Sequence, residues 1–433
     1  MKKNQGFTLI ELLAVVVILA VIALISVPLI MNVIDGARKG ALQNTAYGIA
    51  EAGKYAFTNE VIKDGSAGFT AYIYEDGVES SSPTGKSLNY KGEKPKTGTI
   101  LINSKGDIAL AVYNGKYCAE KGFDDVEVTV SEKVEADCVL VEDLTEVEVL
   151  VVAGGGGGGR GSGGNAGGSG GGAGGLIYNT NYAVIAGGQI DVVVGTGGLG
   201  VPTGPNDAAI GGKGGNSSFG TIITTGGGGG VSFDTISKSS VMDGGSGGGG
   251  HVRTLPYATG YGLGITDQGY NGGQITSGTG GYGGGCGGGG AGGTGANGIA
   301  AASSNATSRP GRAGGLGLLV MGSYYAGGGA GGGDGTSLLT EKALGGSGVG
   351  GNGGTGTTDK ILATDGAPNT GSGGGGGGAS GVPTNGGGNG GSGVVIVRYF
   401  GPQKAQGGAI TTVDGYTIHT FTSGTATFSV MDF

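Results

Sequence analysis

The chain has 433 residues, of which 113 are glycine, and it contains no tryptophan. Glycine has no side chain to bury and loses more backbone entropy on folding than any other residue, so much of this chain cannot build an ordinary apolar core. The formal net charge of −8, without a basic stripe in the sequence, argues against a nucleic-acid-binding protein.

The N-terminus begins with a short basic segment and continues into an apolar run. Lys2 and Lys3 precede this run, which extends from Leu12 to Met31. About 20 helical residues at 1.5 Å each span about 30 Å, the thickness of the hydrocarbon layer of a bilayer. The positive-inside rule places the lysines in the cytoplasm and the rest of the chain outside. We therefore predict one membrane-spanning helix within residues 7–31.

A carboxylate, Glu11, stands at the edge of the apolar run, where it either reaches the lipid headgroups or pairs with a positive charge. The residues that lead to it, Gly6-Phe-Thr-Leu-Ile-Glu11, closely resemble the class III leader of type IV prepilins. That resemblance implies that residues 1–6 are a leader, cut between Gly6 and Phe7, and that the Phe7 amine is N-methylated. It also implies that Glu11 pairs with the Phe7 amine of a neighbouring subunit. An ordinary signal peptide would need a small-residue cleavage site after the apolar run, and residues 32–39 offer none that is convincing.

Beyond Met31 the apolar residues continue at helical spacing to about Phe57, with charged residues between them. This pattern predicts that the helix continues outside the membrane and exposes an amphipathic half that another layer must cover. The segments that follow favour strands at these positions: 69–74, 99–102, 107–113, 116–118, 126–130 and 136–141. Residues 32–145 are therefore predicted to form a head of one helix and a small antiparallel sheet. The pilin resemblance implies the same architecture.

Two of the three cysteines lie in this head, outside the membrane by the predicted topology. Cys118 and Cys138 are either joined in a disulfide or are two buried free thiols. A disulfide that closes this loop would contribute about 3 kcal/mol to stability. The third cysteine, Cys286, has no predicted role.

The composition changes sharply at Ala153, and glycine clusters recur from there to Gly393. The apolar segments that frame the region favour strands: Glu146–Ala153, Gln189–Val194 and Val394–Phe400. A flexible linker, the default for such a composition, needs no such strands. The sequence also lacks the features of three other glycine-rich structures. It has no strict Gly-X-Y period, which collagen requires. Asp334 has no tandem copies, which calcium-binding repeats require, and no glycine cluster is followed by the Lys-Ser/Thr of a P-loop.

The interpretation that remains is a bundle of polyglycine II helices, which are extended chains with three residues per turn and no internal hydrogen bonds. Chains without side chains approach closely enough to bond neighbour to neighbour through the backbone, and each bond contributes about 1 kcal/mol net. The strand-plus-glycine frame of residues 146–400 also resembles the glycine-rich domain of bacteriophage tail-fibre tip adhesins and related bacterial surface proteins. That resemblance implies a polyglycine II sandwich that presents variable loops to a receptor.

Residues 401–433 depart from the order of that family. Tyr416–Val430 resembles the strand pair that usually precedes the first framing strand, but here it follows the domain. This pair of predicted strands either folds back as a permuted edge or is a truncated second copy.

The segments between glycine clusters are rich in tyrosine, asparagine, serine and threonine. Tyrosine is rigid and amphipathic, which suits adaptable recognition or stacking on sugars. The candidate receptor-binding residues are Tyr257, Tyr261, Tyr270, Tyr324 and Tyr325. The same side chains could instead cap the ends of the bundle by packing.

These features predict an α+β protein with a long N-terminal helix, a small antiparallel sheet and a glycine-rich sandwich. We predict a type IV pilin-like filament subunit, minor or at the tip, that displays an adhesive domain. The alternatives are a structural pilin or a pseudopilin whose glycine-rich region is a rigid coat or spacer. The sequence pairs no acid with a base and gathers no metal ligands, so we expect neither an enzyme nor a cofactor or metal.

The predicted partners follow from this assignment. They are other pilin subunits, the prepilin peptidase/methyltransferase, the membrane before assembly, and a glycan or cell-surface receptor. We expect a single-pass precursor in the cytoplasmic membrane that becomes part of an extracellular filament at the cell surface.

Overall fold

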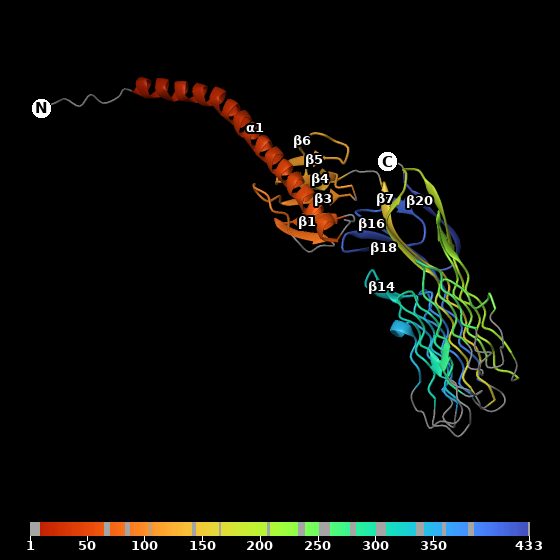
Figure 1. The fold of residues 1–433 in the computed structure, drawn as a ribbon. Helices are drawn as coiled ribbons and strands as arrows, with labels where there is room; N and C mark the ends of the chain where they lie inside the picture. The colour runs from red at the N-terminus through yellow and green to blue at the C-terminus, as the bar shows by residue number, and fades with distance from the viewer. Residues whose placement is uncertain are drawn as a thin grey trace. The chain divides into compact units, whose positions relative to one another are not determined.

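The computed structural model describes residues 9–64, 70–82, 87–103, 105–140, 144–163, 166–205, 208–232, 239–250, 260–277, 283–299, 309–334, 342–356, 361–379 and 385–431. The chain divides into two compact units, residues 1–142 and 143–433, and each is described by itself. One long helix is followed by sheets of mostly antiparallel strands, which confirms the predicted α+β fold class (Figure 1).

Helix α1, Leu9–Asp64, runs through the N-terminal unit and ends later than predicted from the sequence. Its apolar part has a mean hydropathy of 3.2 over 18 residues, none of them buried, and the helix is long and apolar enough to cross a membrane. Its other half presents Leu42, Ala46 and Ile49 to the sheet, where all three are buried. One helix thus combines an uncovered apolar half with a half that belongs to a folded head.

The sheet of this unit has the strand order β2-β1-β3-β4-β5-β6, and all neighbours are antiparallel. The strands are β1 Thr70–Glu75, β2 Val78–Ser82, β3 Thr97–Ile102, β4 Ile108–Tyr113, β5 Tyr117–Lys121 and β6 Thr129–Glu132. Tyr72, Ile100 and Leu110 pack from the sheet onto α1 and form one apolar core with it. β6 begins only at Thr129, later than the strand predicted at residues 126–130.

The strand predicted at residues 136–141 is wrong. Glu135–Asp137 forms a short 3-10 helix, and Cys138 is joined to Cys118 by a disulfide. Leu140 packs beside this buried disulfide. Leu140 therefore covers the cystine instead of adding a strand to the sheet.

The C-terminal unit begins with a sandwich of two five-stranded sheets, in the orders β18-β19-β16-β7-β8 and β11-β10-β9-β20-β17. Their strands are β7 Glu146–Val152, β8 Leu176–Ala183, β9 Gln189–Val194, β10 Ser217–Phe219, β11 Ile222–Thr224, β16 Val394–Phe400, β17 Ala405–Gln406, β18 Ala409–Val413, β19 Tyr416–Phe421 and β20 Gly424–Val430. Val149 of the first sheet shares a buried core with Phe219 and Phe428 of the second. The three framing segments seen in the sequence are β7, β9 and β16.

The C-terminal strand pair completes both sheets of the sandwich. β19 pairs with β16 in one sheet, and β20 pairs with β9 in the other. Residues 405–430 therefore fold back into the glycine-rich unit. They supply inner strands, because β18 and β17 lie outside β19 and β20.

Glycine-rich segments run side by side away from β7 and β16 (Figure 1). The backbone N–H groups of residues 154–159 donate, with a period of three residues, to segments 212–215, 388–391 and 169–172. The carbonyl groups of the same residues accept, with the same period, from segments 227–230, 198–201 and 374–377. Segment 154–159 thus has six neighbouring segments, and the N···O distances of its hydrogen bonds to them are 2.8–3.0 Å. A period of three residues without internal bonds is the polyglycine II conformation predicted from the sequence.

The close approach of six neighbours explains why this segment contains only glycine. A Cβ atom added at any residue from 154 to 159 would lie closer than 3.0 Å to the backbone of a neighbouring segment, a distance that real Cβ atoms essentially never show. A second interior segment, residues 168–173, repeats the pattern of bonds on all sides. Its non-glycine members, Ser169 and Ala173, are small and buried. Backbone hydrogen bonds therefore replace side-chain packing as the core of this bundle.

Candidate assembly and recognition sites

The N-terminal helix carries the candidate assembly site. Glu11 lies in the first turn of α1, where the helix dipole favours a negative charge. Around it the apolar side chains are exposed, for example Leu13 at 62% and Ile18 at 59%. An exposed apolar surface of this extent requires lipid or other protein to cover it. Gly6 and Phe7 lie outside the described residues, so cleavage and methylation there stay predictions from the sequence.

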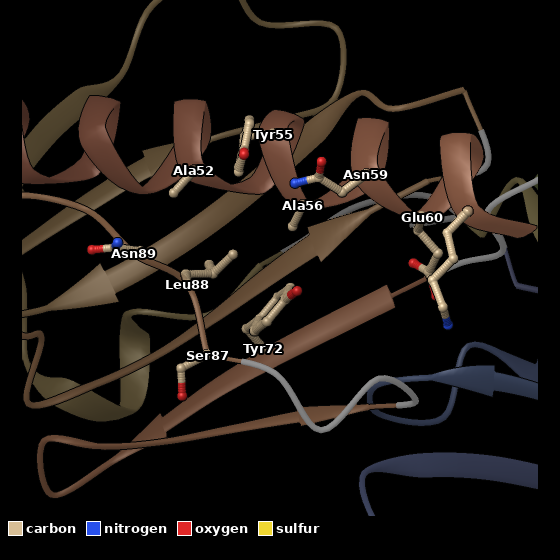
Figure 2. Close-up of a pocket in the computed structure, with 10 residues that line it drawn as sticks. Ala52, Tyr55, Ala56, Asn59, Glu60, Tyr72, Ser87, Leu88 and Asn89 are labelled. Carbon is tan, nitrogen blue, oxygen red and sulfur yellow. The ribbon is translucent and has the colours of Figure 1, made fainter.

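A groove of about 300 Å³ lies in the head between the last turns of α1 and residues 87–89 (Figure 2). Leu88 and the buried Tyr72 point towards the helix and form an apolar floor, and Glu60 lies at the rim. Within the described part of the chain, no group of three His, Cys, Asp or Glu residues could hold a metal ion. We assign no chemistry to this groove.

The cysteines fall into two environments. Cys118 and Cys138, with Cα atoms 5.6 Å apart, form the disulfide that the sequence left as one of two possibilities. Cys286 is free and buried inside the glycine bundle. Burial raises the pKa of its thiol to about 12, so the reactive thiolate is absent at neutral pH. Cys286 therefore fills space in the bundle.

The candidate tyrosines are not equivalent. Tyr257 lies outside the described residues, and Tyr261 is half-buried. Tyr325 of β15 (Ser323–Tyr325) packs against the apolar cluster around Leu150, and burial raises the pKa of its hydroxyl. Tyr324 on the same strand is 46% exposed, and Tyr270 is 50% exposed. The structure thus leaves Tyr270 and Tyr324 as the exposed members of this set among the described residues.

Tyr270 lies in a groove of about 400 Å³ on the flank of the bundle. We call this the Tyr270 groove, and its lining consists of Leu176, Gly264, Thr266, Asp267, Gln268, Gly269, Tyr270, Asn271, Ala291, Thr294 and Leu318. The sequence pointed to Tyr270 by composition alone. It gave no sign that Asp267, Thr294 and Leu318 would join it, because they belong to different turns and a different hairpin.

Two pairs of residues that border undescribed segments meet in the bundle away from the sandwich. The N–H of Ser162 donates to the Ala166 carbonyl, and Arg309 and Asp334 bond to each other. Segment 153–162 is extended at about 3.1 Å per residue, so its end at Ser162 lies about 28 Å beyond β7. The bundle therefore carries residues with side chains to the end opposite the sandwich.

Comparison with known proteins agrees with both parts of this architecture. Residues 132–400, more than half of the chain, match the family model of a glycine-rich domain. Residues 1–27 match the prokaryotic N-terminal methylation motif. Among curated proteins, none matches this chain. The chain thus belongs to the glycine-rich domain family, and its methylation motif and apolar N-terminal helix make it a pilin-like subunit with a membrane-anchored precursor.

Proposed function

We propose that this pilin-like protein is a minor or tip subunit of an extracellular filament and that its glycine-rich unit is an adhesive domain. The observation that carries the proposal is the junction, in one chain, of an N-terminal methylation motif and an ordered bundle. A filament-forming helix supplies an anchor, and a bundle that extends away from its sandwich supplies a platform for contact with a surface.

The size of the glycine-rich unit supports a minor or tip position. A compact unit of residues 143–433 has a radius of gyration of about 19 Å. If every subunit carried such a unit, the units would crowd one another along a filament whose helices pack closely. A subunit at the tip, or one that is rare along the filament, avoids this crowding.

A structural role is the second candidate. The polyglycine II bundle is extensively bonded through its backbone, as a rigid coat or spacer would require. In that case the inserts would need no ligand, and a pseudopilin of a secretion or DNA-uptake machine could use the same unit as a spacer. The two roles differ in what the inserts do.

The part of the proposal that concerns assembly is tested by the cleavage of the precursor and by its entry into filaments. N-terminal sequencing of protein from the cell surface should begin at Phe7. Glu11→Ala should still be cut but should enter filaments poorly, because the Phe7 amine loses its partner. The matched control is Glu51→Ala on the same helix, whose exposed ion pair with Lys54 contributes little. A mature N-terminus after residue 31, or normal assembly of Glu11→Ala, would contradict this half.

The adhesive half is tested on intact cells that carry the assembled protein. Replacement of residues 251–259 and 300–308 by Gly/Ser segments of equal length should preserve the protease resistance of the bundle and reduce binding to target surfaces. Filament number per cell serves as the control. Cells whose filaments are equally abundant and equally adhesive after both replacements would support the coat or spacer instead.

A further inference from the structure

The Tyr270 groove is built where three elements of the bundle meet. One wall is the turn at residues 265–268, closed by the bond from Gln268 N–H to the Ile265 carbonyl (3.1 Å). A second wall is the turn at residues 290–293, closed by the bond from Gly290 N–H to the Gly293 carbonyl (2.9 Å). Leu318 of β14 (Leu318–Val320) forms the third side. The groove lies near the sandwich, because the carbonyl of Gln268 accepts from the first residue of β8.

The backbone of this groove is held in place before any ligand binds. The backbone of Tyr270 is part of the bundle, since its N–H donates to Gly290 and its carbonyl accepts from Gly247. The Gln268 side chain accepts from Thr225 N–H (2.8 Å), and the Asn271 side chain accepts from Gly264 N–H (2.9 Å). A site on such fixed elements loses little entropy when it binds a ligand.

The side chains that remain available combine one aromatic face with several hydrogen-bonding groups. Tyr270, Thr266, Asp267 and Thr294 are all exposed. Among the described residues, no hydrogen bond or ion pair engages the Asp267 carboxylate or the Thr294 hydroxyl. A carboxylate accepts hydrogen bonds, hydroxyls donate and accept them, and the tyrosine ring offers an apolar face. Leu176 and Ala291 make the floor partly apolar.

The charge of the groove restricts its ligand. Among the described lining residues, Asp267 is the one ionisable acid or base apart from the tyrosine hydroxyl, and none of them is a lysine or arginine. An anionic ligand would meet an unbalanced carboxylate, which disfavours it. A long apolar peptide would leave the exposed polar groups unpaired. A ligand with one apolar face and a rim of neutral hydroxyls fits both conditions.

We propose that the Tyr270 groove binds a neutral saccharide, with one sugar ring stacked on Tyr270 and its hydroxyl groups bonded to Asp267 and Thr294. A volume of about 400 Å³ accommodates one or two sugar rings. This site lies near the sandwich, beside the first residue of β8. It would let the glycine-rich unit bind a neutral glycan at this groove.

The test uses the full-length protein in lipid nanodiscs, which avoids sugar-based detergents. Wild type is screened on an array of neutral, amino and acidic saccharides and is then titrated with the free neutral sugars that it binds. Tyr270→Ala should weaken binding at least about tenfold, as truncation of a central aromatic anchor does. Tyr270→Phe keeps the ring and should stay within about threefold of wild type. Tyr324→Ala removes an exposed tyrosine that does not line the groove and should leave the affinity unchanged.

Asp267→Asn provides a second variant that leaves the backbone bonds of the bundle in place. It should weaken binding of neutral saccharides and reduce the discrimination against acidic ones. The proposal is overturned if wild type binds no saccharide, if it binds only acidic saccharides or peptides, or if Tyr270→Ala or Asp267→Asn binds neutral sugars as wild type does. These outcomes are independent of the adhesion assay, in which the inserts are replaced and the groove is intact.

Discussion

The head and the glycine bundle solve the same problem, the burial of backbone polar groups, in different ways. In the head, a six-stranded sheet pairs its own backbone, and side chains such as Ile49 and Leu110 fill the space between sheet and helix. In the bundle, segment 154–159 has no side chains, and its backbone groups bond to six neighbours. Apolar burial stabilises the first core, whereas the second depends on a dense set of bonds that each contribute about 1 kcal/mol net.

The stability of the two cores should therefore differ in its sensitivity to changes in side-chain volume. A side-chain core tolerates some loss or gain of volume because neighbours relax. A polyglycine II core has no side chain that could move aside, since the atoms that an added Cβ would meet are backbone atoms. Small changes of volume should therefore be far more damaging in the bundle than in the head.

The largest effect is expected for Gly158→Ala. The added Cβ would meet the Gly375 carbonyl, so the bundle must separate or stay unfolded, at a cost of more than about 5 kcal/mol. Gly293→Ala is the matched control, because the nearest atom to its Cβ would be Leu316 N at 3.7 Å. The measurement is protease resistance and thermal unfolding of the full chain. Equal stability of the two variants would show that the bundle is not closely packed.

A smaller effect, confined to the other unit, is expected for Leu110→Ala. Leu110 is fully buried between the sheet and α1, and its truncation should destabilise the head by about 3 kcal/mol. Because the head and the glycine-rich unit are separate compact units, the bundle should keep its resistance to proteases. Loss of resistance in the bundle as well would show that the two cores fold as one.

The smallest effect on stability is expected from the titration of His419, which lies in the sandwich core. Its ring bonds to the Gly407 carbonyl through Nδ1 (2.8 Å) and to the Tyr399 hydroxyl through Nε2 (3.0 Å). Since that hydroxyl already accepts from Lys404 and Ala405 N–H, it donates to Nε2, and the imidazole is neutral. Burial lowers the pKa of His419 below its usual value, an effect partly offset by the bond to Gly407.

Because the pKa of His419 is lower in the folded protein than in the unfolded chain, the unfolded chain takes up the proton more readily. The stability that His419 contributes is therefore present above about pH 6.5 and is lost as the pH falls below it, at up to about 1.4 kcal/mol per pH unit. His419→Phe should lower the overall stability and remove this slope. Unfolding by denaturant between pH 7.5 and 5 measures it, and parallel curves for wild type and variant would contradict the assignment.

The sequence predicted the features that local patterns determine. The apolar run, the leader residues and the strands with Val-Val repeats such as β7 and β16 could all be read directly. The glycine clusters predicted polyglycine II because the framing strands argued against a flexible linker and the missing Gly-X-Y period argued against collagen. The strand predicted at residues 136–141 failed because the disulfide at Cys138 overrode its apolar pattern.

Features that depend on distant pairing could not be predicted. Nothing in the residues 401–433 showed that β19 and β20 would enter different sheets as inner strands. Likewise, Tyr270 and Tyr325 have the same residue type and similar flanking composition, but one lies in an open groove and the other packs on an apolar cluster. Their difference depends on which glycine segments become neighbours, and uniform glycine runs contain no information about register.

The most direct test of the account is hydrogen exchange of the backbone amides in residues 154–159. These residues belong to neither helix nor strand, yet each N–H is bonded to another segment and buried. Measured by mass spectrometry on the full-length protein, their exchange should be as slow as that of β4 in the core of the head. Exchange at the rate of an unstructured glycine linker would contradict the polyglycine II core.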